Sequence, residues 1–302
     1  MVQGAIAILR AVLRQRIRGR LLALFVTMLA VLGTVDPAVA VQLRLVRRIR
    51  TTPFVGTSVW MKDAEGSAFV PKNKSLWLAD DNGRSLYEVN HATGALKRVI
   101  GRRSFESARR PGGGPTAGAA RTADFESIAY DRARDTLYVF SGPCCKTSVL
   151  PTVFRLKRNA QGRFRVESYR PLPRTANYTA AAWNPLNGKL YVGHGRNLRT
   201  YHYPRNRVGP VFRIPHLRCI TGLGFSANGR DLFVTTSDEE LRRVRWSTKR
   251  LVAGWTFDLT PFGIRDSRAV DRIGRRFFVL DGYDRRPKGD PRRFAVFVLG
   301  VV

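Results

Sequence analysis

The chain lacks a hydrophobic run long enough to cross a membrane. Its main apolar run, Leu21 to Gly33, covers 13 residues, whereas a transmembrane helix needs about 20. Five arginines precede this run, and Ala38-Val39-Ala40 follows it. This order is typical of a secretory signal peptide. We therefore expect residues 1–40 to be a cleaved signal and the protein to be secreted or held in the cell envelope. An uncleaved signal anchor, the alternative, would be its only attachment to a membrane.

Acidic residues are scarce. The 302 residues include 22 Asp and Glu but 53 Lys and Arg, for a net charge of +31, and only nine of the basic residues are lysines. Two interpretations stay open. Codon usage in a GC-rich genome would favour arginine without any functional cause. Alternatively, the protein has an anionic partner, such as a cell-wall polymer or a phosphorylated small molecule. Export makes nucleic acid an unexpected partner in vivo.

Cysteine and histidine are also rare, with three and four residues. The histidines show no zinc-binding spacing, and no nucleophile elbow or phosphate-binding loop is present. Three cysteines in an exported chain predict one disulfide and one free thiol. Cys219 could pair with Cys144 or Cys145 across the mouth of a channel. The rival is a bond between the adjacent Cys144 and Cys145.

No segment after residue 40 has the 3.6-residue apolar period of an amphipathic helix. Short runs rich in aromatic and β-branched residues recur instead, each after a group of turn residues. They begin at Leu76, Leu137, Leu190, Leu232 and Phe277. These starts lie 61, 53, 42 and 45 residues apart. A period of about 45 residues built only of strands is typical of β-propeller blades.

Each repeat divides into four strands, which predicts an all-β protein with a β-propeller of five blades; six blades is the alternative. The outer strand of the third repeat is placed at 211–214. The fifth repeat has only three strands, and residues 41–49 supply the fourth, which would close the ring and remove its exposed edge. We expect 41–302 to be one monomeric domain. The Gly- and Arg-rich segment 101–121 is expected to be a flexible insertion.

The repeat also aligns polar residues. The heptapeptides DAEGSAF and DFESIAY begin at Asp63 and Asp124. Eleven residues before the start of each of the five aromatic and β-branched runs stands an acidic or a hydroxyl residue: Glu65, Glu126, Thr179, Thr221 and Asp266. Four residues after each start stands another polar residue: Asp80, Ser141, His194, Thr236 and Asp281. In a propeller, both positions fall at the same end of the central channel, so these side chains should ring its mouth.

Carboxylates held close together resist ionising at the same time. Glu65, Glu126 and Asp266 therefore need a partner, and two interpretations stay open. In one, the side chains cap strand ends and join blades, with the nearby Arg218, Arg265 and Arg268 balancing the charge. In the other, they bind Ca²⁺, which takes about six to eight oxygen ligands. The remaining polar residues at this end are predicted ligand contacts: Asp63, Asp80, Asp124, Thr179, His194, Thr221 and Asp281.

Two stretches resemble known propeller families. Residues 63–96 resemble a blade of the gluconolactonase/regucalcin-like propellers, which carry Glu-Gly before a strand and an Asp at the end of the next strand. Residues 124–142 are similar to exported phytase-like propellers, which carry an Asp-aromatic-Glu-x-Ile-Ala phrase. The first resemblance implies that Glu65 helps to hold a divalent metal, together with Asn and Asp residues from later blades. Thr179 and Thr221 stand in the column where those partners are expected.

Two functions follow from these observations. The first is an exported binding module. Its polar, acidic channel mouth binds a small-molecule, cell-wall or protein ligand without catalysing a reaction, and the basic body of the protein favours an anionic ligand. Complete repeats and the absence of a nucleophile–base pair support it. The alternative is a calcium-dependent hydrolase of a lactone or phosphoester, in which the metal activates water and Glu126 or His194 is the general base.

Overall fold

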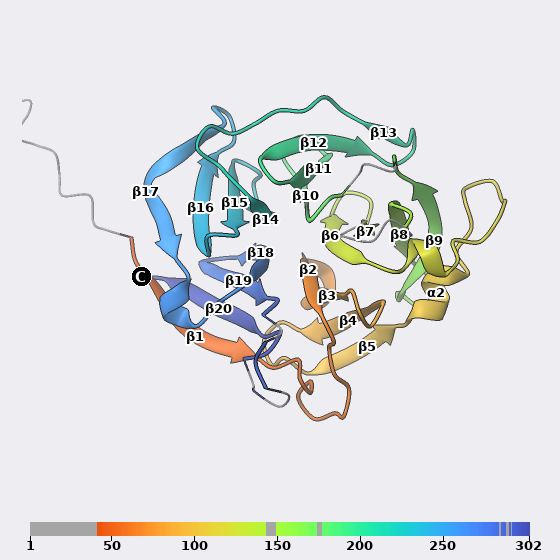
Figure 1. The fold of residues 1–302 in the computed structure, drawn as a ribbon, viewed down its shortest axis with the longest axis horizontal. Helices are drawn as coiled ribbons and strands as arrows, with labels where there is room; N and C mark the ends of the chain where they lie inside the picture. Colours follow the sequence, from red (N-terminus) through yellow and green to blue (C-terminus); the bar gives the residue numbers. More distant parts are fainter. Residues whose placement is uncertain (1–40, 143–148, 174–176, 284, 288–289, 291) are drawn as a thin grey trace, which may run out of the picture. The chain divides into compact units, whose positions relative to one another are not determined.

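The computed structural model describes residues 41–142, 149–173, 177–283, 285–287, 290 and 292–302. Residues 42–302 form one compact unit, which contains every strand described. These strands form five four-stranded antiparallel sheets arranged as the blades of a β-propeller (Figure 1). The prediction of five four-stranded blades is confirmed.

Each blade is an up-and-down meander that starts at the channel. Blade 1 consists of β2 (Ala64–Val70), β3 (Ser75–Asp80), β4 (Ser85–Asn90) and β5 (Leu96–Ile100). Blade 2 consists of β6 (Phe125–Asp131), β7 (Thr136–Ser141), β8 (Thr152–Arg158) and β9 (Phe164–Pro171). Blade 3 consists of β10 (Ala180–Asn184), β11 (Lys189–His194), β12 (Asn197–His202) and β13 (Arg207–Val208). Blade 4 consists of β14 (Ile220–Phe225), β15 (Asp231–Thr236), β16 (Glu240–Arg245) and β17 (Arg250–Asp258).

Blade 5 joins the two ends of the propeller. It consists of β18 (Ser267–Ile273), β19 (Arg276–Asp281), β20 (Val296–Val301) and β1 (Leu43–Ile49). β1 pairs antiparallel with β20, from Leu43 opposite Val301 to Ile49 opposite Val296. The predicted closure of the last blade by the N-terminal strand is therefore confirmed.

The hydrophobic core lies between the blades, because each strand alternates its side chains between the two faces of its sheet. The described residues form five buried clusters, one at each junction between neighbouring blades. Trp77 of blade 1 and Phe164 of blade 2, for example, meet edge to face with centroids 5.6 Å apart. Near the axis the strands come very close, and a Cβ on Gly66 would lie 2.8 Å from the Cα of Ser127. Only glycine fits there.

Two predicted segments differ from the structure. The insertion 101–121 carries the short helix α2 (Arg102–Glu106), and Phe105 of this helix is fully buried against Phe125 and Phe154. The segment is thus anchored by an aromatic side chain that the Gly and Arg content concealed. The outer strand of blade 3 is the two-residue β13, whereas Phe212, within the predicted strand 211–214, forms only an isolated bridge with Leu198.

The predicted signal peptide, residues 1–40, lies outside the described residues. In the part of the chain that the structure describes, no helix is long and apolar enough to span a membrane. Export, the cleavage after Ala40 and the signal-anchor alternative therefore stay predictions.

Candidate functional site

β-bulges mark one residue in each of four blades at one end of the channel. The pairing between the innermost and second strands skips one residue in four blades: Glu65, Glu126, Thr221 and Arg268. A bulge leaves the extra residue out of the ladder and redirects its side chain. We call this end of the channel the acidic end; its charged residues are Asp63, Glu65, Asp81, Asp124, Glu126, Asp266 and Arg268.

The residue at the bulge of blade 5 is Arg268, where the eleven-residue spacing placed Asp266. The β18–β19 turn has two residues between the paired Ile273 and Arg276, whereas the β2–β3 turn has four between Val70 and Ser75. A shorter turn moves the equivalent position two residues along the chain. Blade 5 therefore presents a cation where blades 1 and 2 present carboxylates, and Asp266 aligns with Asp63 instead.

Arg268 binds two of the three predicted metal ligands. Its Nη1 lies 2.9 Å from Oε2 of Glu65, and its Nη2 lies 2.7 Å from Oδ2 of Asp266. Burial opposes the charge of Arg268, but Glu65 and Asp266 outweigh it and raise the pKa of the guanidinium. Burial also raises the pKa of Glu65 well above its usual range, against the pull of Arg268 and with the help of Glu126. This ion pair joins blade 1 to blade 5.

Glu126 lacks such a partner. The residue is 3% exposed, and its Oε1 accepts no hydrogen bond from any residue that the structure describes. Burial, followed by the charges of Asp124 and Asp81, raises the pKa of Glu126 to about 8. Asp81 was not among the predicted site residues, although it directly follows Asp80 in the sequence.

A second buried acceptor lies beside Glu126. A Cβ on Gly142 would stand 2.7 Å from Oδ1 of Asn177 and 3.1 Å from Cγ of Glu126. The side chain of Asn177 thus approaches Glu126 across the space that glycine leaves open. Oδ1 of Asn177 is buried and has no hydrogen-bond partner among the described residues. Two buried oxygens, one from blade 2 and one from the segment before β10, therefore lie near each other, and neither has a hydrogen-bond partner among the described residues.

The three predicted metal ligands are not all available to bind a metal ion. Arg268 binds Glu65 and Asp266, which leaves Glu126 as the one predicted ligand without a counterion in the described part of the chain. Within that same part, no three His, Cys, Asp or Glu side chains are arranged to hold a metal ion. The arrangement does not fit calcium bound by all three carboxylates together, and calcium binding stays a prediction.

Two of the predicted ligand contacts hold loops in place through hydrogen bonds. Asp80 is fully buried and accepts hydrogen bonds from the backbone N–H groups of Lys62, Asp63 and Gly83, at 2.8–3.0 Å, and from the hydroxyl of Tyr87. Asp281, also fully buried, accepts the N–H groups of Arg265 and Asp266 and pairs with Arg286. Both carboxylates hold the segment that enters their own innermost strand.

The threonines and the histidine lie at the ends of strands in blades 3 and 4. Thr179 donates a hydrogen bond to the carbonyl of Ile220 at 3.2 Å, which joins these two blades. The hydroxyl of Thr221 lies 3.2 Å from that of Thr235 within blade 4. His194 is exposed at the end of β11. Of the two remaining predicted contacts, Asp63 accepts a hydrogen bond from Asn82 at 2.8 Å, and Asp124 is 5% exposed beside Glu126.

The two alternative cysteine predictions have different outcomes. Cys219 is a free, exposed thiol, so the predicted bond across the mouth is not formed. Cys144 and Cys145 lie outside the described residues, and so does the rival bond between them.

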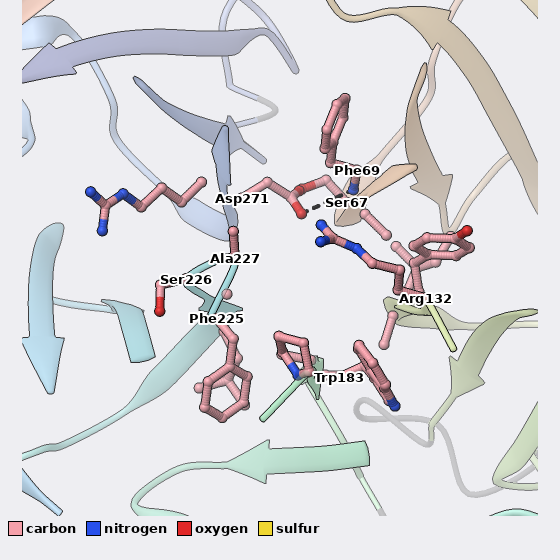
Figure 2. Close-up of a pocket in the computed structure, with 18 residues that line it drawn as sticks. Ser67, Phe69, Arg132, Trp183, Phe225, Ser226, Ala227 and Asp271 are labelled. Carbon is pink, nitrogen blue, oxygen red and sulfur yellow. Dashed lines mark hydrogen bonds between the residues drawn. The ribbon is translucent and has the colours of Figure 1, made fainter. Parts of the chain in front are cut away.

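The opposite end of the channel contains a cavity of about 80 Å³ (Figure 2). Asp271 of blade 5 stands there, at the position where the other blades have alanine or glycine. It accepts hydrogen bonds from the hydroxyl of Ser67 and, at 3.0 Å, from the N–H of Phe69. Burial raises the pKa of Asp271 to about 6. Figure 2 shows Arg132 extending toward this pair, while the rings of Phe69 and Phe225 point away from the centre.

The raised pKa of Glu126 predicts a pH-dependent stability. Between about pH 4.5 and pH 8 the folded protein keeps the proton of Glu126 while the unfolded chain releases it. Stability of the wild type therefore falls as the pH rises through this window, by at most about 1.4 kcal/mol per pH unit. The Glu126→Gln variant cannot ionise and is expected to gain stability relative to the wild type from pH 5 to pH 8. Urea unfolding at both pH values measures this difference.

Glu167→Gln is the matched control, because it removes the same charge from a side chain that is 39% exposed on β9. Its stability difference from the wild type should stay nearly constant over the same range. A constant difference for Glu126→Gln as well would contradict the raised pKa.

The comparisons with known proteins show the fold. No protein-family model matches this chain, and neither does any curated protein sequence. The PQQ-bound aldose sugar dehydrogenase from Streptomyces coelicolor is similar in structure, with a TM-score of 0.58 and 12% identity over 88% of this chain and 100% of that one. Glutaminyl cyclase from Myxococcus xanthus has a TM-score of 0.57 and 11% identity, over 86% and 97%. The resemblance to β-propeller proteins is confirmed, and the closer one to gluconolactonase-like or phytase-like propellers stays a prediction.

Proposed function

We propose that this protein is a ligand-binding propeller that takes up a cationic, N–H-donating group at its acidic end. The observation that carries the proposal is the pair of buried acceptors, Oε1 of Glu126 and Oδ1 of Asn177, that meet without a donor among the described residues. The hydroxyl of Ser141, on the second strand of the same blade, is also buried and unpaired there. Buried polar groups are nearly always hydrogen-bonded in folded proteins, so such a group of exceptions calls for an occupant.

The charge around Glu126 selects the kind of occupant. Asp124, Asp81 and Asp63 all disfavour its ionised form, and of the basic residues Arg268 opposes them from its position between Glu65 and Asp266. A proton on Glu126 relieves part of this repulsion. An ammonium group would relieve more, because it brings a full positive charge and several N–H donors to a site of low dielectric constant. The ligand group would thus replace the proton.

Thermal melting with a simple diamine tests the proposal. Adding 1,4-diaminobutane should raise the Tm of the wild type in a concentration-dependent way, since a ligand that binds only the folded state stabilises it. The shift should grow from pH 6 to pH 9, as Glu126 loses its proton. Glu126→Gln should lose the shift, and Glu167→Gln should keep it. Equal shifts in both variants would refute binding at Glu126.

A calcium-dependent hydrolase is the second candidate. It is favoured by the pKa of Glu126, about 8, because a general base works best when its pKa lies near the operating pH. Calcium, if bound, would polarise the carbonyl or phosphoryl group; Glu126 and Asn177 each have a buried oxygen without a partner among the described residues that could ligate it. Melting in EDTA and in millimolar CaCl₂, followed by lactone and phosphoester assays, tests this function. A calcium shift with turnover, both lost in Glu126→Gln, would favour the enzyme over the binding module.

A further inference from the structure

A groove lined by arginines lies between blades 1 and 2, away from the channel. It has a volume of about 360 Å³ and is bordered by β5, by β9 and by helix α2 with the turn that follows it. Figure 1 shows α2 beside β9 on the outer side of these blades. We call it the arginine groove. Its polar lining residues are Arg98, Ser104, Ser107, Arg163 and Arg165.

The arginines of the groove are poorly neutralised. Arg98 lies 3.7 Å from Glu88, a carboxylate that also accepts a hydrogen bond from Ser75 at 2.7 Å. Arg163 and Arg165 are exposed. No acidic side chain lines the groove in the part of the chain that the structure describes. Burial, together with the neighbouring Arg163 and Arg165, lowers the pKa of Arg98 despite the opposing charge of Glu88.

Aromatic rings hold two guanidinium groups in place beside this surface. Arg98 stacks over Trp77 at 5.1 Å, and Arg158 stacks over Phe164, a lining residue of the groove, at 4.2 Å. Arg158 also pairs with Asp135 at 2.8 Å. Even so, Nε of Arg98 and Nη2 of Arg158 are buried and have no hydrogen-bond partner among the described residues. Guanidinium groups that aromatic rings already hold in place are suited to an anion, because little side-chain entropy is lost on binding.

We infer that the arginine groove binds a phosphate group of an anionic ligand. Arginine pairs with phosphate through parallel N–H···O bonds. Arg165 on β9 and Arg163 directly before this strand line one side of the groove, and Arg98 on β5 lines another. On the third side the hydroxyl of Ser104 is a further donor, while that of Ser107 donates to the carbonyl of Ser104 at 3.3 Å. A tetrahedral anion with several oxygens can use donors from three directions, whereas a planar carboxylate uses fewer. This site would give the basic surface a specific role in addition to its general charge.

The inference does not depend on the proposed function. The acidic end would take a cationic group inside the channel, and the arginine groove would take an anionic group on the outside of blades 1 and 2. Failure of one experiment leaves the other untouched.

Calorimetry with two probes tests the groove. Inorganic phosphate and short linear polyphosphate are titrated into the purified protein at physiological salt. Arg163→Ala/Arg165→Ala should weaken polyphosphate binding at least about tenfold, as expected for the loss of charge-assisted bonds. Because both side chains are exposed, the Tm should stay unchanged. Binding of inorganic phosphate by the wild type would show that a free phosphate suffices, and binding of polyphosphate alone would assign the site to a polymer.

The control variant removes two positive charges from a different blade. Arg205 and Arg207 are exposed in blade 3, and Arg205→Ala/Arg207→Ala should change the affinity less than about twofold, through net charge only. Equal losses in the two double variants would overturn the inference, since they would reduce it to nonspecific attraction. So would a wild type that binds neither probe.

Discussion

A chain that begins at residue 50 is expected to lose its folded state, whereas a chain that begins at residue 41 keeps it. Without β1, the backbone of β20 would be left as an unpaired edge along its whole length. Ile49 would also be removed from the cluster between blades 5 and 1, and Leu43 and Leu45 from the cluster between blades 4 and 5. Open sheet edges with hydrophobic surroundings promote association between chains. The shorter chain should elute as aggregate and show no cooperative thermal transition.

Adding residues 41–50 as a separate peptide provides the control. If the missing strand is the cause, the peptide should restore part of the soluble monomer. A monomeric chain from residue 50 with a Tm within a few degrees of the wild type would show that the closure is dispensable.

Replacing Asp80 by alanine is expected to destabilise the folded protein strongly. Its carboxylate accepts three backbone N–H groups and the hydroxyl of Tyr87 in a fully buried position. Leaving these donors unpaired should lower the free energy of unfolding by about 3–5 kcal/mol, since each buried unpaired group costs about 1–3 kcal/mol. Urea unfolding at pH 7 measures the change.

Two further variants serve as controls for the loss of stability in Asp80→Ala. Asp80→Asn keeps one acceptor oxygen and should lose less stability than Asp80→Ala. Asp258→Ala removes a carboxylate that caps Thr260 at an exposed position, and its effect should be small. If Asp80→Ala were no worse than Asp258→Ala, the carboxylate would not be what holds the entry to β2.

The blades could be predicted from the sequence because their signals are local. Aromatic and β-branched runs and the turn residues before them lie within one repeat, and the missing fourth strand of blade 5 had one candidate at the other end of the chain. The burial of Phe105 had no such signal. Its partners, Phe125 and Phe154, are 20 or more residues away and meet it only in the folded blade.

The site could be predicted only in part. Glu65 and Glu126 stand at bulges as the constant spacing required, but that spacing fails for Asp266 because the β18–β19 turn is shorter. The short turn around Gly274 was visible in the sequence and could have pointed to Arg268. The different roles of Asp80 and Glu126 could not be predicted in this way. Both are acids at strand ends, and they differ in whether a neighbouring loop brings N–H donors to them.

The pairing of β1 with β20 also sets the order in which the protein can fold. β1 is the first described strand to be synthesised, and its partner is the last, so this contact spans nearly the whole domain. Contacts between residues so distant in sequence form late and slow the folding of β proteins. Blades 1 to 4 can each pair their own strands as the chain emerges, but the ring cannot close before β20 has been synthesised. During that interval β1 is an unpaired strand, and its three arginines, Arg44, Arg47 and Arg48, are the kind of charged residues that protect such an edge from pairing with another chain.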